Sequence, residues 1–186
     1  MKVPVVDNGG QWTHREWRVL RDLGADSRIV PNTVGLEELD ADGVVLSGGA
    51  LSLEGTAALG RVGDWIDRVA VPVLAICVGH QFLGRHFGGQ VEKGGPEFGS
   101  VDLEVDRPDH PLFAGLAPRL KVWASHSDQV AVAPPGWPIL AHSAACRVEA
   151  MAHPERPIWG VQFHPEVAHT EGGLEIFRHF LAACRR

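Results

Sequence analysis

Residues 73–82 read VLAICVGHQF: an apolar run ends in Cys77 and is followed at once by Val-Gly-His-Gln. The run is short and follows Pro72, which predicts a buried strand, and the residues after the cysteine predict a helix over 79–89. Strand, reactive side chain and helix in this order are typical of a nucleophile elbow, a sharp turn that exposes the nucleophile. The positive end of the helix dipole favours a thiolate there. The alternative is a buried core cysteine, since free cysteines are among the most buried residues.

Strands and helices alternate outward from this stretch in both directions. We expect strands at 2–7, 42–46 and 158–163, helices at 11–24, 61–69 and 172–184, and short β runs between 98 and 163. This pattern predicts an α/β fold: an open, mostly parallel sheet with helices on both faces and a small antiparallel insertion. A chain of 186 residues is expected to form a single domain over 1–186.

Composition and charge exclude several classes of function. Lys and Arg number 17 against 23 Asp and Glu, a net charge of -6, so no nucleic-acid partner is expected. No apolar run is long enough for a membrane span, and the N-terminus lacks the apolar region of a signal peptide, so we expect a cytoplasmic protein. Cys77, Cys146 and Cys184 form no CxxC pair and no two histidines have HxxxH spacing, so neither a disulfide framework nor a metal site is predicted.

A second set of reactive side chains follows the strand expected at 158–163. His164 and Glu166 come directly after it, and residues two apart on an extended chain face the same side. The carboxylate could therefore hold one imidazole nitrogen while the other faces a nucleophile, which would complete a triad. A second His-Pro-Glu, at 153–155, precedes the same strand and is excluded by position. The alternative for His164 is a turn histidine with its polar atoms satisfied.

A third strand end carries Ser47, Gly48 and Gly49. Paired glycines let backbone N–H groups approach a ligand closely, although a simple tight turn is the alternative. With the N–H of Val78, the residue after the candidate nucleophile, such a turn would make an oxyanion hole.

AICVGHQ, SGG and FHPE, in this order and at these separations, resemble the class I (triad-type) glutamine amidotransferases, which have a flavodoxin-like fold. Within that family, DNGGQW near the start, KVWASHSDQV at 121–130 and FHPEVAHTEGG at 163–173 resemble the glutaminase part of GMP synthases. Two positions depart from the family pattern: Ala75 stands where glycine is usual before the nucleophile, and Ala50 stands where SGGP is usual.

The resemblance implies a role for each matching residue. Cys77 is expected to be the nucleophile, His164 the general base and acid, and Glu166 the carboxylate that orients the imidazole. The resemblance also implies oxyanion-hole amides at Gly49 and Val78 and contacts to the substrate glutamine from Gln81, Ser127 and Asp128. Glutamine would be hydrolysed through a glutamyl thioester, with no cofactor or metal in this subunit.

The resemblance further implies a partner. GMP synthases need ATP chemistry, and this chain shows no phosphate loop of the kind that an ATP pyrophosphatase carries. We therefore expect a heterodimer with a separate ATP pyrophosphatase subunit that binds ATP and Mg, activates XMP and receives the ammonia. A partner touching the loop that contains His169 could shift Glu166 and switch on hydrolysis. Thr170 is expected to cap the final helix.

The glutaminase subunit of another amidotransferase stays open as an alternative, as do three other classes of protein. A γ-glutamyl hydrolase could use the same triad without a partner. A non-catalytic regulatory module would usually lose a triad member, and a nucleotide-binding flavodoxin-like domain would need a phosphate loop after its first strand.

Overall fold

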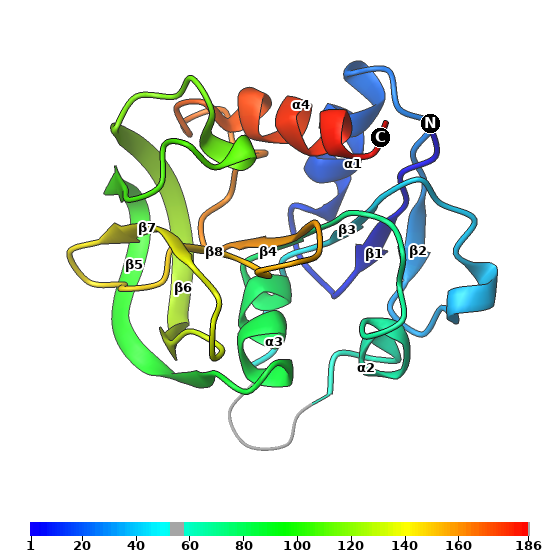
Figure 1. The fold of residues 1–186 in the computed structure, drawn as a ribbon, viewed down its shortest axis with the longest axis horizontal. Helices are drawn as coiled ribbons and strands as arrows, with labels where there is room; N and C mark the ends of the chain where they lie inside the picture. The colour runs from blue at the N-terminus through cyan, green and yellow to red at the C-terminus, as the bar shows by residue number, and fades with distance from the viewer. Residues whose placement is uncertain (53–57, 186) are drawn as a thin grey trace.

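The computed structural model describes residues 1–52 and 58–185, which form one sheet flanked by helices (Figure 1). The nine strands of the described sheet lie in the order β2-β1-β3-β4-β9-β8-β7-β5-β6. The strands are β1 Val5–Asp7, β2 Ile29–Pro31, β3 Val44–Leu46, β4 Val73–Ile76, β5 Gln90–Val105, β6 Arg119–Val132, β7 Ile139–Ser143, β8 Ala150–Ala152 and β9 Ile158–Val161. The helices are α1 Thr13–Asp22, α2 Val62–Trp65, α3 Val78–His86 and α4 Gly173–Ala183, with 3-10 turns at Leu36–Glu38 and Pro111–Phe113.

The sheet has two halves that meet at β9. In the parallel half, β2, β1, β3, β4 and β9 pair in parallel. In the antiparallel half, β8 pairs with β9, β7 with β8, β5 with β7 and β6 with β5, all antiparallel. The second half is the antiparallel insertion that the sequence predicts, and it contributes four of the nine described strands.

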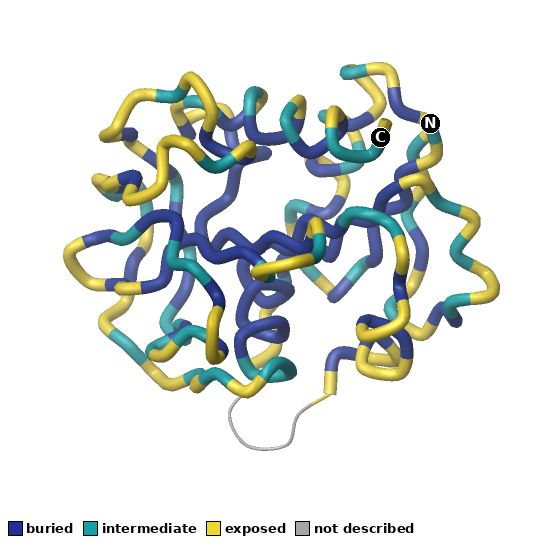
Figure 2. The backbone as a smooth tube through the Cα atoms, viewed as in Figure 1, coloured by how far each residue is buried: buried dark blue, intermediate teal, exposed yellow. Residues whose placement is uncertain are grey.

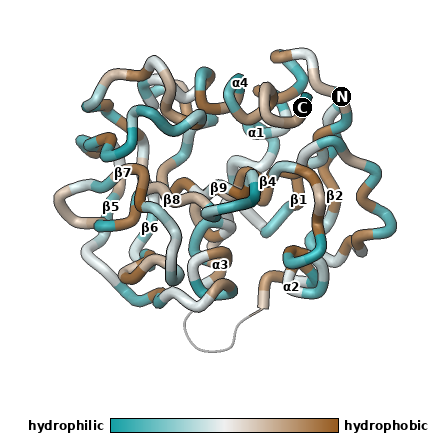
Figure 3. Tube along the Cα trace, viewed as in Figure 1, coloured by the Kyte–Doolittle hydropathy of each residue, from teal (hydrophilic) through white to brown (hydrophobic). Residues whose placement is uncertain are grey.

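Strand β4 runs through the centre of the sheet and is buried on both faces. Val73 and Ala75 pack into the core shared with α2 and α3, whereas Leu74 and Ile76 pack into the core shared with α1 and α4. The alternation follows from the two-residue period of a strand. Figure 1 shows α1 and α4 on one side of the sheet and α2 and α3 on the other. The buried residues in Figure 2 and the hydrophobic ones in Figure 3 both concentrate on the central strands. The predicted α/β fold is confirmed.

The helix expected at 61–69 is much shorter, because α2 ends at Trp65. Arg156, from the loop before β9, donates hydrogen bonds to the carbonyl oxygens of Ile66 at 3.1 Å and Val69 at 2.6 Å. These carbonyls are therefore satisfied without further helical turns, and the chain can enter β4 directly.

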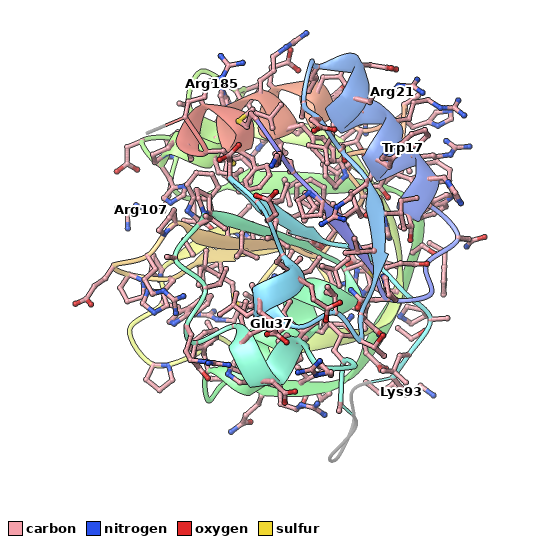
Figure 4. The ribbon with its side chains drawn as sticks, turned by 90° about the vertical axis from the view of Figure 1, so that its right-hand side faces the viewer. Trp17, Arg21, Glu37, Lys93, Arg107 and Arg185 are labelled. Carbon is pink, nitrogen blue, oxygen red and sulfur yellow. The ribbon has the colours of Figure 1, made fainter. Side chains whose placement is uncertain are left out.

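Charged side chains surround the sheet. In Figure 4, the labelled Arg21, Lys93 and Arg107 point away from the molecule, and all three are exposed. The Arg21 guanidinium also lies 4.9 Å from the centre of the Trp17 ring on the same helix. Within residues 1–52 and 58–185, we find no helix with the length and apolar character that a membrane crossing requires.

Candidate active site

Cys77 stands at a sharp turn between β4 and α3. Its backbone has φ 50° and ψ -105°, and it is the one non-glycine residue with positive φ in the described part of the chain. Such a conformation costs about 1–3 kcal/mol and is held only by its surroundings. Gly79 allows the tight turn, because a Cβ there would lie 2.9 Å from the carbonyl oxygen of Leu46. Ala75 is fully buried, and the missing side chain of Gly79 leaves room beside its methyl group, so alanine at position 75 is compatible with this elbow.

His164 and Glu166 form a buried hydrogen-bonded pair beside the cysteine. Nδ1 of His164 lies 2.6 Å from Oε1 of Glu166, and the two side chains are 6% and 0% exposed. Burial, the largest influence, lowers the pKa of His164, but hydrogen bonds with Cys77 and Glu166 outweigh burial and raise this pKa to about 10. At neutral pH the imidazole is therefore protonated in this arrangement, with its charge between a carboxylate and a sulfur atom.

The loop after β9 holds His164 in place. Its backbone N–H donates to the carbonyl oxygen of Trp123 at 2.8 Å, and its carbonyl oxygen accepts from the Thr170 hydroxyl at 2.7 Å. The Trp12 ring meets the imidazole edge-on, with centroids 4.4 Å apart. The expected cap on the last helix is wrong: Gly172 is the N-cap of α4, because the Thr170 hydroxyl is already committed to His164.

The second His-Pro-Glu lies at the opposite end of β9. Nδ1 of His153 accepts hydrogen bonds from the backbone N–H groups of Glu155 and Arg156, both at 3.1 Å. The backbone N–H of His153 donates to the carbonyl oxygen of Ile158, at the start of β9. This histidine therefore stabilises the turn that precedes β9, at the end of the strand opposite to His164.

Gly48 and Gly49 are glycines because other groups approach them closely. A Cβ on Gly48 would lie 3.1 Å from Cε1 of His164, and a Cβ on Gly49 would lie 2.4 Å from the carbonyl oxygen of Asn8. That Cβ of Gly49 would also lie 3.0 Å from Cγ1 of Val78. The two predicted oxyanion-hole residues are thus neighbours.

Three hydrogen bonds hold the loop formed by Ser47, Gly48 and Gly49, called the glycine loop below. The Asn8 side chain donates to the carbonyl oxygen of Ser47, and the backbone N–H of Asn8 donates to the Ser47 hydroxyl, both at 2.9 Å. The backbone N–H of Gly48 donates to Oε1 of Glu16 at 3.2 Å. These contacts fix the loop although Ala50 replaces the usual proline.

Two cavities meet at Cys77. The first, of about 270 Å³, is lined by Gly49, Ala50, Leu51, Ser52, Cys77, Gln81, Phe98, Ser125, His126, Ser127 and Asp128. The second, of about 220 Å³, is lined by Gly9, Gly10, Gln11, Trp12, Glu16, Gly48, Gly49, Ala50, Cys77, Ser125 and His164. The structure therefore separates the predicted substrate-binding residues, around the first cavity, from the imidazole, in the second.

The Gln81 side chain is buried and makes two hydrogen bonds within the protein. Its Nε2 donates to the carbonyl oxygen of Asp128 at 2.6 Å and to Oε1 of Gln162 at 3.2 Å. The Asp128 carboxylate accepts from the Ser52 hydroxyl at 2.6 Å. Gln81 thus joins α3 to the cavity wall on β6, and its direct contact with substrate stays a prediction.

Sequence reasoning missed Glu16, a fully buried carboxyl group in the second cavity. Burial, and next the charge of Glu166, raise the pKa of Glu16 well above its ordinary value. The signal was available: Thr13, Glu16 and Leu20 are the buried residues of α1, and their spacing is that of one helix face. Gln162, which contacts Cys77, was also missed because it lies inside an apolar run.

A further buried cluster lies in the antiparallel half. Potential ligand atoms of Glu97, His126 and Glu149 lie within 4.8 Å of one another. However, Glu97 already accepts a hydrogen bond from Ser143 at 2.8 Å and lies 3.1 Å from Nε2 of His126. Burial, and next the charge of Glu97, raise the pKa of Glu149, so this carboxyl keeps its proton and can donate it to Glu97. This pairing does not satisfy every buried polar atom of the cluster, since both ring nitrogens of His126 lack a hydrogen-bond partner among the described residues, and the absence of a metal site stays a prediction.

Comparison with known proteins agrees over nearly the whole chain. The family model "Glutamine amidotransferase class-I" matches residues 4–184. The chain is 49% identical to a glutamine-hydrolyzing GMP synthase subunit of Thermoplasma acidophilum, covering 99% of this chain and 93% of the relative. It is 46% identical to the protein of the same name from Thermococcus kodakarensis, covering 98% of each.

Solved structures give the same picture. A crystal structure from Thermoplasma acidophilum, assigned to the same GMP synthase subunit, superposes with a TM-score of 0.93 at 48% identity, covering 100% of this chain and 94% of that one. A glutamine amidotransferase from Thermotoga maritima superposes with a TM-score of 0.75 at 20% identity, covering 100% of this chain and 82% of that one, and shares the fold.

Proposed function

The chain belongs to the class I glutamine amidotransferase family, and from this premise we propose that it is the glutaminase subunit of a two-subunit GMP synthase. The observation that carries the proposal is the buried hydrogen bond between His164 and Glu166, which lies beside Cys77 in the second cavity, at the ends of β4 and β9. Relatives named as one subunit of a glutamine-hydrolysing GMP synthase, matching along nearly their full length, support it.

Hydrolysis begins with attack by the Cys77 thiolate on the side-chain amide carbon of glutamine. The carbonyl oxygen becomes an oxyanion, which the backbone N–H groups of Gly49 and Val78 stabilise. His164 gives its proton to the amide nitrogen, the carbon–nitrogen bond breaks and ammonia leaves. The product of this half-reaction is a glutamyl thioester on Cys77.

His164 serves both halves of the reaction. Its raised pKa supplies the proton that ammonia needs as a leaving group. Once that proton is gone, the neutral imidazole accepts one from water, which attacks the thioester and releases glutamate. Glu166 holds Nδ1 throughout, so that Nε2 faces the reacting atoms.

The first cavity is the proposed glutamine site. Its wall combines a hydroxyl and a carboxylate, Ser127 and Asp128, with the nucleophile at its base. The Asp128 carboxylate suits the ammonium group of an amino acid. Gln81 donates a hydrogen bond to the Asp128 carbonyl oxygen and thereby fixes the position of this wall relative to Cys77.

The proposal includes a partner. Ammonia would pass to a separate ATP pyrophosphatase subunit that binds ATP, Mg and XMP, in a cytoplasmic heterodimer, while this subunit needs no cofactor. The His169 ring packs on the Trp123 ring, with centroids 5.0 Å apart, and the Trp123 carbonyl holds the backbone of His164. A partner pressing on His169 could therefore move the imidazole, and a misplacement of about 1 Å can cost about 100-fold in rate.

The test measures glutamate release by the chain alone and during titration with the candidate synthetase subunit, ATP and XMP. We expect slow hydrolysis alone and strong activation in the complex. Cys77→Ala should abolish hydrolysis while the complex still makes GMP from added ammonium. Rapid hydrolysis of γ-glutamyl peptides by the lone chain would favour a γ-glutamyl hydrolase instead.

A further inference from the structure

The Gln162 side chain has no part in the mechanism above, yet it contacts the nucleophile. It lies directly after β9 with 0% of its surface exposed, and its Nε2 donates toward Sγ of Cys77 at 3.7 Å. Its Oε1 accepts a hydrogen bond from Nε2 of Gln81 at 3.2 Å, and Gln81 also donates to the Asp128 carbonyl oxygen. A continuous chain of hydrogen bonds thus runs from the cavity wall to the sulfur atom.

Backbone contacts leave this side chain little freedom. The backbone N–H of Gln162 donates to the carbonyl oxygen of Glu149 at 2.7 Å. The backbone N–H of Cys77 donates to the carbonyl oxygen of Val161, the preceding residue, at 2.9 Å. The amide and the sulfur atom are therefore carried by two strands in fixed register.

The orientation of the amide is also fixed. Because Gln81 donates to Oε1, the oxygen end of Gln162 is occupied and the nitrogen end faces the sulfur atom. An N–H donor stabilises a thiolate more than a neutral thiol, since hydrogen bonds to charged acceptors are the stronger ones. The amide also keeps its protons when His164 gives up its own.

Building on the proposed role of Cys77, we propose that Gln162 is a catalytic hydrogen-bond donor that stabilises the Cys77 thiolate, with Gln81 fixing its orientation. Two donors then share the sulfur atom: His164, which transfers its proton during the reaction, and Gln162, which does not. The hydrogen bonds through Gln81 and Gln162 thereby hold the Asp128 backbone and the Cys77 sulfur atom in one fixed arrangement.

The test compares two substitutions that differ in charge. Gln162→Glu keeps the shape but replaces the N–H donor with an acceptor, and Gln162→Met removes both hydrogen bonds without adding charge. We measure the rate at which iodoacetamide alkylates Cys77, located by mass spectrometry. At neutral pH, Gln162→Glu should slow alkylation about 10- to 100-fold and Gln162→Met somewhat less. Gln90→Glu, an exposed site on β5, is the matched control and should match wild type.

The pH dependence separates this role from a merely structural one. At a pH high enough to ionise Cys77 in every variant, the variants should regain the wild-type alkylation rate of Cys77, whereas a displaced sulfur atom would react slowly at every pH. In the complex with its synthetase, the glutaminase kcat should fall in parallel. Wild-type rates in the Gln162→Met variant at neutral pH, or equal slowing at all pH values, would overturn the inference. If Gln162→Glu does not fold, Gln162→Met decides alone. Failure of the proposed function would look different: wild-type Cys77 would react no faster than Cys184.

Discussion

The two halves of the sheet contribute to the site in different ways. In the parallel half, Cys77 follows directly after β4, His164 lies three residues after the end of β9, and the glycine loop follows β3. In the antiparallel half, Ser127 and Asp128 lie inside the 14-residue strand β6. The first arrangement uses strand ends that any parallel sheet brings together, whereas the second needs a long strand to pass the cavity at the right register.

An irregularity in β5 marks the place where β6 passes the cavity. Lys93 pairs with Asp128 and Glu97 with His126, so three residues of β5 face a single residue of β6. A bulge of this kind bends a strand and redirects its side chains. From this comparison we expect the parallel half to supply the chemistry and the antiparallel half to supply binding, and the first two substitutions below test that division.

The largest expected effect is in the parallel half. His164→Ala should lower the glutamine-dependent rate of the complex by at least about 10³-fold, as loss of a triad member does. His153→Ala removes a histidine from the same motif at the other end of β9 and should leave the rate nearly unchanged. Steady-state glutamate release measures both. The reverse ranking would contradict the assignment of chemistry to the carboxyl ends of the parallel strands.

In the antiparallel half, Asp128→Asn should weaken binding and spare the chemistry. Loss of the proposed charged partner for the substrate ammonium should raise KM for glutamine about 10- to 100-fold, with kcat nearly unchanged. Asp102→Asn is the matched control, because Asp102 is an exposed carboxylate on β5 that pairs with Lys121 at the surface. A fall in kcat with KM unchanged would show that the two halves do not divide the work in this way.

A smaller effect, on stability alone, is expected from the buried cluster in the antiparallel half. The pKa of Glu149 is raised in the folded state, so the folded protein binds more protons than the unfolded chain above about pH 4.5, and stability falls as pH rises toward the folded-state pKa. Glu149→Gln keeps a hydrogen-bond donor to Glu97 and removes this loss. Its Tm should exceed that of wild type by a margin that grows as the pH rises above about 4.5, at about 2–4 °C for each 1 kcal/mol of stability.

Thermal unfolding followed across this pH range checks the result, with the exposed Glu155→Gln as control. A Glu149→Gln variant that is less stable than wild type at high pH would contradict a protonated Glu149.

The smallest effects are expected at the two other cysteines. Cys146 is fully buried and Cys184 lies at the end of α4, where its thiol donates to the Phe180 carbonyl oxygen at 3.3 Å. Burial raises the pKa of both thiols, so neither is a nucleophile at neutral pH. Cys146→Ala and Cys184→Ala should leave glutamine hydrolysis unchanged. Loss of hydrolysis in either folded variant would contradict the assignment of Cys77 as the nucleophile.

The same division explains what could be predicted from sequence. In the parallel half, a local sequence pattern marks the strand ends: a short apolar run is followed by a reactive or small residue. This pattern was enough to predict the positions of Cys77, His164 and the glycine loop. The position of Ser127 and Asp128 on the cavity wall depends on pairing between β5 and β6, which no local pattern of β6 specifies. Only the family resemblance pointed to them.

Buried polar groups were the hardest to predict. Glu16 and Glu149 are charged residue types that usually lie at the surface, and their burial depends on contacts from distant elements. Thr170 was predicted to cap the final helix because capping depends on residues next to a helix in sequence. Its hydroxyl instead donates a hydrogen bond across the loop to the carbonyl oxygen of His164.

The central claim, that Cys77 carries the covalent chemistry, is tested most directly by trapping the intermediate. The complex is mixed with radiolabelled glutamine, ATP and XMP, quenched in acid during turnover and digested for mass spectrometry. We predict a glutamyl group on the peptide that contains Cys77, and none in the Cys77→Ala variant. A label on Cys146 or Cys184, or glutamate release by the Cys77→Ala variant at the wild-type rate, would contradict the account.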